Sequence, residues 1–214
     1  MGYTQFKKSF GNQIALFILA VVGISVASYS PIFSSTDHHL ISGFVSIDQP
    51  DRITCGPTCA LMLLRYYGND EVDVDELTIS SKTHWFDYNK LPIGMTSPYD
   101  LLTALNTSGL PCEMSYGSMS TLREHIGEDR PVIVLLRSDE YLWHYVVATG
   151  YNKDHIIVAT DGYYKHMKNE HFRGSWEFSA DMDGNRCSDK IFPGLLGLAD
   201  VYPFMMIVPK ESRK

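Results

Sequence analysis

The chain has 214 residues, 44% of them hydrophobic and 12% aromatic, which is enough for one domain with a core and gives no reason to expect two. Nothing in this composition is typical of a disordered or fibrous protein. The formal net charge of -7, without a basic stripe, argues against a nucleic-acid partner.

A targeting segment is predicted over residues 1–29. Lys7 and Lys8 precede an apolar stretch, and the tripeptide Ser-Val-Ala at 25–27 fits a cleavage signal. The stretch is short for a membrane span, which needs about 20 apolar residues. A cleaved signal peptide and an uncleaved inner-membrane anchor formed by residues 14–29 therefore both stay open. In either case the lysines remain cytoplasmic, and we expect the rest of the chain to be exported, to the periplasm or the extracellular space.

A Ser-rich linker over residues 30–41 follows, and a charged tail is expected at 210–214. The folded domain is therefore predicted over residues 42–209.

Helices are expected in the first half of this domain. Apolar residues recur at helical spacing and are stopped by Gly68 in the first helix. Ser97 and Pro98 are typical of the start of a helix, which here ends at Gly109. Ser118 or Ser120 caps another. The expected helices cover residues 57–67, 74–80, 97–109 and 118–129.

Strands are expected in the second half, where β-branched and aromatic runs alternate with polar breaks. Helices followed by strands favour an α+β architecture with an antiparallel sheet. The expected strands cover residues 130–137, 143–151, 155–161 and 202–209.

One hairpin in this region has a consequence for function. If Asn152 and Lys153 form its two-residue turn, Tyr151 pairs with Asp154, and His144 then stands opposite Asp161. A four-residue loop gives the same register, whereas a three-residue loop would break it.

A histidine paired with a carboxylate in this way can activate a cysteine as a nucleophile. A carboxylate beside an imidazole selects one tautomer and stabilises the imidazolium. A helix N-terminus and a nearby imidazolium both lower a thiol pKa, and Cys55 precedes the first expected helix. Cys55, His144 and Asp161 therefore form a candidate nucleophilic system. Gln49, six residues before Cys55, can donate to an oxyanion together with the Cys55 backbone N–H.

These residues lie in segments that resemble a known family. The stretch QPDRITCGPT at 49–58, with an apolar helix ending in RYYG, resembles the start of a C39-like peptidase domain, a branch of the papain-like cysteine peptidases. GMTSPYDLLTALNTSGL, RPVIVLL and WHYVVATGYNKDHIIVATD resemble its later segments. The similarity covers residues 49–161 and extends more faintly to Trp176.

The resemblance implies a papain-like α+β fold in which the Cys-bearing helix packs on an antiparallel sheet. By position it implies Cys55 as nucleophile, His144 as general base and acid, Asp161 as orienting carboxylate and Gln49 as oxyanion donor. Gly162 follows Asp161 where the family usually has proline. The best-known members trim leader peptides as domains fused to ABC transporters; this chain has no P-loop, so the resemblance supports the chemistry rather than that substrate.

The expected function is that of an exported thiol protease, a hydrolase that cleaves a peptide or protein substrate through a thioester, without cofactor or metal. Two alternatives remain: an acyltransferase or transglutaminase-like enzyme with the same triad, and a non-catalytic peptide-binding module.

Structural interpretations of the same residues also remain open. Cys55 can be a structural cysteine, or a metal ligand with Cys59 and His144, although a fourth ligand is missing. His144 can be a core histidine, and Asp161 can simply end a strand. Gln49 can be a surface amide. If Cys55 is a working thiol, at most one disulfide forms among the remaining cysteines, with a weak preference for Cys112 and Cys187.

Overall fold

The computed structural model describes residues 38–88, 91–137, 143–177 and 203–213, all of which belong to one unit, Asp37–Lys214. The predicted targeting segment lies outside the described residues, as do most of the linker and Cys187. Within the described ranges, no helix combines the length and the apolar character needed to cross a membrane.

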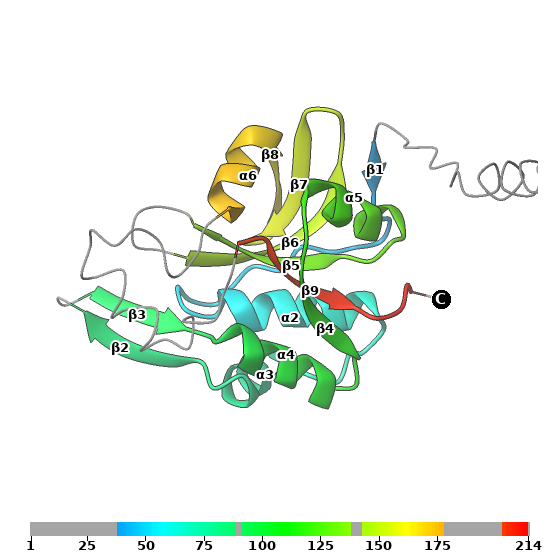
Figure 1. The fold of residues 1–214 in the computed structure, drawn as a ribbon. Helices are drawn as coiled ribbons and strands as arrows, with labels where there is room; N and C mark the ends of the chain where they lie inside the picture. The colour runs from blue at the N-terminus through cyan, green and yellow to red at the C-terminus, as the bar shows by residue number, and fades with distance from the viewer. Residues whose placement is uncertain (1–37, 89–90, 138–142, 178–202, 214) are drawn as a thin grey trace, which may run out of the picture. The chain divides into compact units, whose positions relative to one another are not determined.

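An antiparallel sheet forms the centre of the domain (Figure 1). Its strand order is β4-β9-β5-β6-β7-β8, and β1 pairs with the C-terminal end of β6. These strands are β1 (His39–Leu40), β4 (Cys112–Tyr116), β5 (Val132–Arg137), β6 (Trp143–Tyr151), β7 (His155–Thr160), β8 (Tyr163–Lys168) and β9 (Met205–Pro209). A separate hairpin consists of β2 (His84–Tyr88) and β3 (Leu91–Met95).

Helices cover both faces of the central strands. Figure 1 shows α2, α3 and α4 on one side of β5 and β6, and α5 and α6 on the other. Residues 132–136 of β5 are accordingly all buried, as expected for a strand covered on both faces. The α+β fold with the Cys-bearing helix packed on an antiparallel sheet is therefore confirmed. The helices are α2 (Cys55–Tyr66), α3 (Val74–Ser80), α4 (Pro98–Thr107), α5 (Met119–Gly127) and α6 (Asn169–Trp176).

The helix α2 is the core helix of the domain. Every residue in it except Cys55 and Arg65 is buried. It ends in a Schellman motif: Asn69 N donates to Leu64 O at 2.9 Å, and Gly68 takes a φ of 86° that favours glycine. Gly68 thus stops the helix where the sequence predicted.

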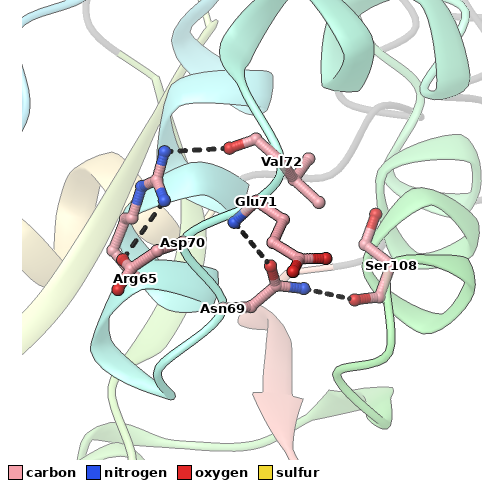
Figure 2. A network of polar contacts seen from close by, with 6 residues as sticks. All are labelled: Arg65, Asn69, Asp70, Glu71, Val72 and Ser108. Carbon is pink, nitrogen blue, oxygen red and sulfur yellow. Dashed lines mark hydrogen bonds and ion pairs between the residues drawn. The ribbon is translucent and has the colours of Figure 1, made fainter.

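A polar network anchors the loop that follows α2 (Figure 2). Arg65 donates to Asp70 Oδ1 at 3.1 Å and to the Val72 carbonyl at 3.0 Å. Asn69 Nδ2 donates to the Ser108 carbonyl at 2.8 Å, at the C-terminal end of α4. The network therefore ties the end of α2 to α4 and sets the approach of α3.

The hairpin between β6 and β7 differs from the expected one. Asn152 Oδ1 accepts bonds from the backbone N–H groups of Asp154 and His155, at 2.9 and 2.8 Å, so the turn residues are Lys153 and Asp154. Tyr151 pairs with Ile156, and the register shifts again between Ala148 and Gly150. The expected pairing of Tyr151 with Asp154 is wrong, and His144 does not stand directly opposite Asp161.

A second hairpin, not predicted from the sequence, follows at once. Thr160 pairs with Tyr163, and Asp161 and Gly162 form the turn with φ angles of 45° and 76°. Two consecutive positive φ angles define a type I′ turn, for which Asp-Gly is a preferred pair. Proline cannot adopt the φ of Gly162, so this turn could not form with a proline at position 162.

Candidate active site

Cys55 is the first residue of α2. Asp51 Oδ1 accepts bonds from the backbone N–H groups of Ile53 and Thr54, at 2.8 and 3.0 Å, and so turns the chain into the helix. The half-buried Cys55 thiol lies near the backbone N–H groups of Tyr145 and Gly56, which act to lower its pKa. The sulfur therefore lies at the contact between α2 and β6.

Gly56 allows this close contact. A Cβ at this position would lie 3.1 Å from Thr96 Cβ and 3.3 Å from Tyr145 Cδ2. Tyr145 is fixed in turn, because its hydroxyl donates to the Thr96 carbonyl at 3.0 Å. Tyr145 directly follows His144 in β6, so the N-terminus of α2 lies against the strand that carries His144. The described residues show no hydrogen bond between the Cys55 sulfur and the His144 ring.

The His144 ring is linked to Asp161 through a hydroxyl. His144 Nε2 lies 2.8 Å from Thr160 Oγ1, and this hydroxyl donates to Asp161 Oδ2 at 3.2 Å. The direct separation of His144 Nε2 and Asp161 Oδ2 is 3.7 Å, within ion-pair distance but beyond hydrogen-bond length. The structure thus brings His144 and Asp161 together, although not by the register that we expected.

Burial controls the ionisation of the two groups. It raises the pKa of the Cys55 thiol above 9.0; the backbone N–H groups of Tyr145, Gly56 and Cys55 act in the opposite direction, and the Asp161 charge adds to the increase. Burial also lowers the pKa of His144 below 6.5, against the effect of Asp161 and with that of Lys165. The expected lowering of the thiol pKa is therefore wrong for the resting site, because desolvation of the sulfur exceeds the helix and backbone contributions.

Gln49 lies in the segment that packs on the Asp161 turn. Gly162 N donates to the Ile47 carbonyl at 3.1 Å, and Asp48 Cβ would lie 3.3 Å from a Cβ on Gly162. Gln49 itself is half-buried, and its amide makes no hydrogen bond with the described residues. Its neighbours therefore fix it near the turn, while its role toward an oxyanion stays a prediction.

The remaining cysteines are thiols in the described part of the chain. Cys59 and Cys112 are buried and free, and Cys187 lies outside the described residues, so the weak preference for a disulfide between Cys112 and Cys187 finds no support. Among the described residues, no three His, Cys, Asp or Glu side chains gather as a metal site.

Sequence reasoning missed two features of the site. The Thr160 hydroxyl gave no signal of its own, because its position depends on the strand register. The proximity of the Tyr145 backbone N–H to the sulfur is equally invisible in a sequence. The Asp-Gly pair at 161–162, by contrast, is a strong hairpin signal that was available.

The fold is that of the C39 peptidase domains. The structure resembles the peptidase domain of Streptococcus ComA, a bifunctional ABC transporter involved in quorum sensing, with a TM-score of 0.53 and 18% identity over 78% of this chain and 98% of that one. It also resembles a protein from Bacillus anthracis described as a C39-like peptidase, with a TM-score of 0.58 and 15% identity over 82% of this chain and 98% of that one. No curated protein sequence matches the chain.

The family model agrees with the fold. The model of the Peptidase C39-like family matches residues 41–181, which is more than half of the chain and includes Gln49, Cys55, His144 and Asp161. The protein belongs to the Peptidase C39-like family.

Proposed function

We propose that the protein is an exported cysteine peptidase in which Cys55 attacks a peptide carbonyl and His144 acts as general base and acid. The observation that carries this proposal is that the N-terminus of α2, which carries Cys55, packs on Tyr145 of β6, the strand that also carries a histidine linked to a carboxylate through a hydroxyl. Membership of the Peptidase C39-like family supports a peptide bond as the target.

The reaction begins with both groups neutral. His144 removes the proton of the Cys55 thiol as the sulfur bonds to the substrate carbonyl carbon, and the oxyanion accepts bonds from the Cys55 backbone N–H and the Gln49 amide. The tetrahedral intermediate then expels the amine, which takes the proton from His144. Water, deprotonated by His144, hydrolyses the thioester and restores the thiol.

The chemistry needs a base in its neutral form. The lowered pKa of His144 keeps the imidazole neutral at neutral pH, so it is ready to accept the thiol proton. The elevated thiol pKa means that the proton leaves during attack rather than beforehand.

A test uses the full chain and a library of peptides, with products identified by mass spectrometry. We expect the wild type to add water across peptide bonds, Cys55→Ala to lose this activity, and Cys59→Ala, which removes a buried thiol one turn further along α2, to keep it. Cleavage undiminished in Cys55→Ala would end the assignment of the nucleophile. Products carrying an amine instead of water would favour the acyltransferase, and a wild type that binds peptides without changing them would favour the non-catalytic module.

A further inference from the structure

Thr160 lies between the base and the carboxylate of the candidate site. It is 5% exposed, at the end of β7, and its side chain contacts both His144 and Asp161. The Asp161 turn after it is held by the bond from Gly162 N to the Ile47 carbonyl at 3.1 Å. The hydroxyl is therefore in a fixed position relative to both partners.

A hydroxyl has one proton, and this fact determines the direction of the bonds. Thr160 donates its proton to Asp161 Oδ2, since a carboxylate can only accept. Its oxygen must then accept from His144 Nε2 at 2.8 Å, so Nε2 carries the ring proton. In the neutral ring this leaves Nδ1 as the unprotonated nitrogen, the one able to take a proton from a thiol.

We propose that Thr160 is a positioning residue that fixes the neutral His144 ring as its Nε2–H tautomer and so presents Nδ1 as the base. This inference rests on the proposed function. In the same arrangement Asp161 acts on the ring through Thr160, since the direct separation of 3.7 Å is too long for a hydrogen bond. Thr160 does not touch substrate in this scheme and acts only through His144.

Two substitutions separate this role from packing. Thr160→Val keeps the branched shape but removes the hydroxyl, whereas Thr160→Ser keeps the hydroxyl and removes a methyl group. Thermal unfolding of both variants shows whether the β7 end stays folded; if Thr160→Val unfolds, Thr160→Ala provides the smaller apolar replacement.

The direct readout is the ring ¹⁵N chemical shifts of His144 in the full chain. They are measured at about pH 8, where an imidazole is neutral, and assigned by the loss of signal in His144→Gln. We expect the wild type and Thr160→Ser to carry the proton on Nε2, and Thr160→Val to lose this preference. The same Nε2–H spectrum in Thr160→Val, or a proton on Nδ1 in the wild type, would overturn the proposal.

Peptide hydrolysis is the second readout. We expect kcat to fall between about 10- and 100-fold in Thr160→Val, with KM little changed and Thr160→Ser close to wild type. A Thr160→Val enzyme with wild-type kcat would also overturn the proposal. A wild type without peptidase activity would instead contradict the proposed function, and the tautomer measurement, which needs no substrate, would still decide the role of Thr160.

Discussion

At the scale of single residues, the site keeps its sulfur protonated until substrate is present. The backbone N–H groups of Tyr145, Gly56 and Cys55 favour the thiolate, but burial, which is the largest effect, and the Asp161 charge favour the thiol. His144 is neutral for the same reason, because burial disfavours its charged form. Both groups are therefore neutral at rest, as a thiol and an imidazole rather than as thiolate and imidazolium.

The two neutral groups predict how the reactivity of Cys55 and the rate of hydrolysis change with pH. Below the thiol pKa, the thiolate fraction increases about tenfold per pH unit, so alkylation of Cys55 by iodoacetamide should accelerate steadily from pH 6 to 9. Peptide mapping distinguishes Cys55 from Cys59 and Cys112. A rate that is constant over this range would contradict the neutral pair. Hydrolysis, which needs the neutral imidazole, should be lost only as the pH falls through the His144 pKa, below 6.5.

Asp161 can have two roles, one in catalysis and one in the conformation of the turn. It contributes charge near His144, and it occupies a turn position with a φ of 45°, which Asp and Asn tolerate better than most residues. A substitution that keeps the turn and removes the charge can separate them.

Asp161→Asn is that substitution. We expect its free energy of unfolding to stay within about 0.5 kcal/mol of wild type, because Asn also suits the left-handed region. We expect its kcat/KM to fall between about 10- and 1,000-fold, because the charge that stabilises the imidazolium is gone. Asp161→Ala should lose activity too, and in addition about 1 kcal/mol of stability. Asp161→Asn with full activity would leave Asp161 as a turn residue only. Urea unfolding and steady-state kinetics provide both measurements.

At the scale of elements, α2 depends on its two ends. Its N-terminus contacts β6 through Gly56, and its C-terminus is joined to α4 through Asn69. The first contact places the sulfur, and the second contributes to stability far from it.

Asn69→Ala tests the second contact. The substitution leaves the Ser108 carbonyl without its side-chain donor, so we expect a loss of about 1 to 2 kcal/mol in the free energy of unfolding, measured in urea. Asp70→Asn is the matched control in the same loop. Its ion pair with Arg65 is exposed, with 79% of the Asp70 side chain accessible, and its loss should cost less than about 0.5 kcal/mol. Equal effects of the two substitutions would contradict the role given to Asn69.

The sequence predicted the helices better than the sheet. Gly68, Pro98 and Gly109 act locally, through φ angles and missing N–H groups, so helix ends could be placed from them. The register of β6 and β7 depends on which backbone N–H groups the Asn152 side chain binds and on a shift near Ala148. Neither feature can be recognised from the identity of one residue, as a helix end can. The sequence analysis missed five strands, β1, β2, β3, β4 and β8, and the helix α6.

The candidate site was predicted by residue type, and less well by geometry. His144 and Asp161 are near each other and the Asp161 charge acts on the Cys55 thiol, but the direct cross-strand pair was wrong and a hydroxyl stands between ring and carboxylate. Burial of the sulfur, which reverses the expected pKa shift, could not be known before the packing of Tyr145 was known.

At the scale of the whole molecule, export stays a prediction based on residues 1–29. It can be tested in a bacterium that expresses the full chain. Protease added to spheroplasts should degrade the domain, whereas a chain without residues 1–29 should be protected inside the cytoplasm. The mass of the recovered protein then separates a cleaved signal from an uncleaved anchor, against 24.2 kDa for the intact chain. Equal protection of both chains would contradict export.

The strand β9 gives the domain a particular order of assembly. It lies between β4 and β5 (Figure 1). The Trp176 indole donates to the Met205 carbonyl at 2.9 Å. Of the described strands, β9 leaves the ribosome last, yet it fills an interior place and joins β4 to the rest of the sheet. Until these residues have been synthesised, β4 and β5 both lack β9 as their partner strand and the core is incomplete. A growing chain therefore cannot complete its central sheet until the last described strand has been synthesised.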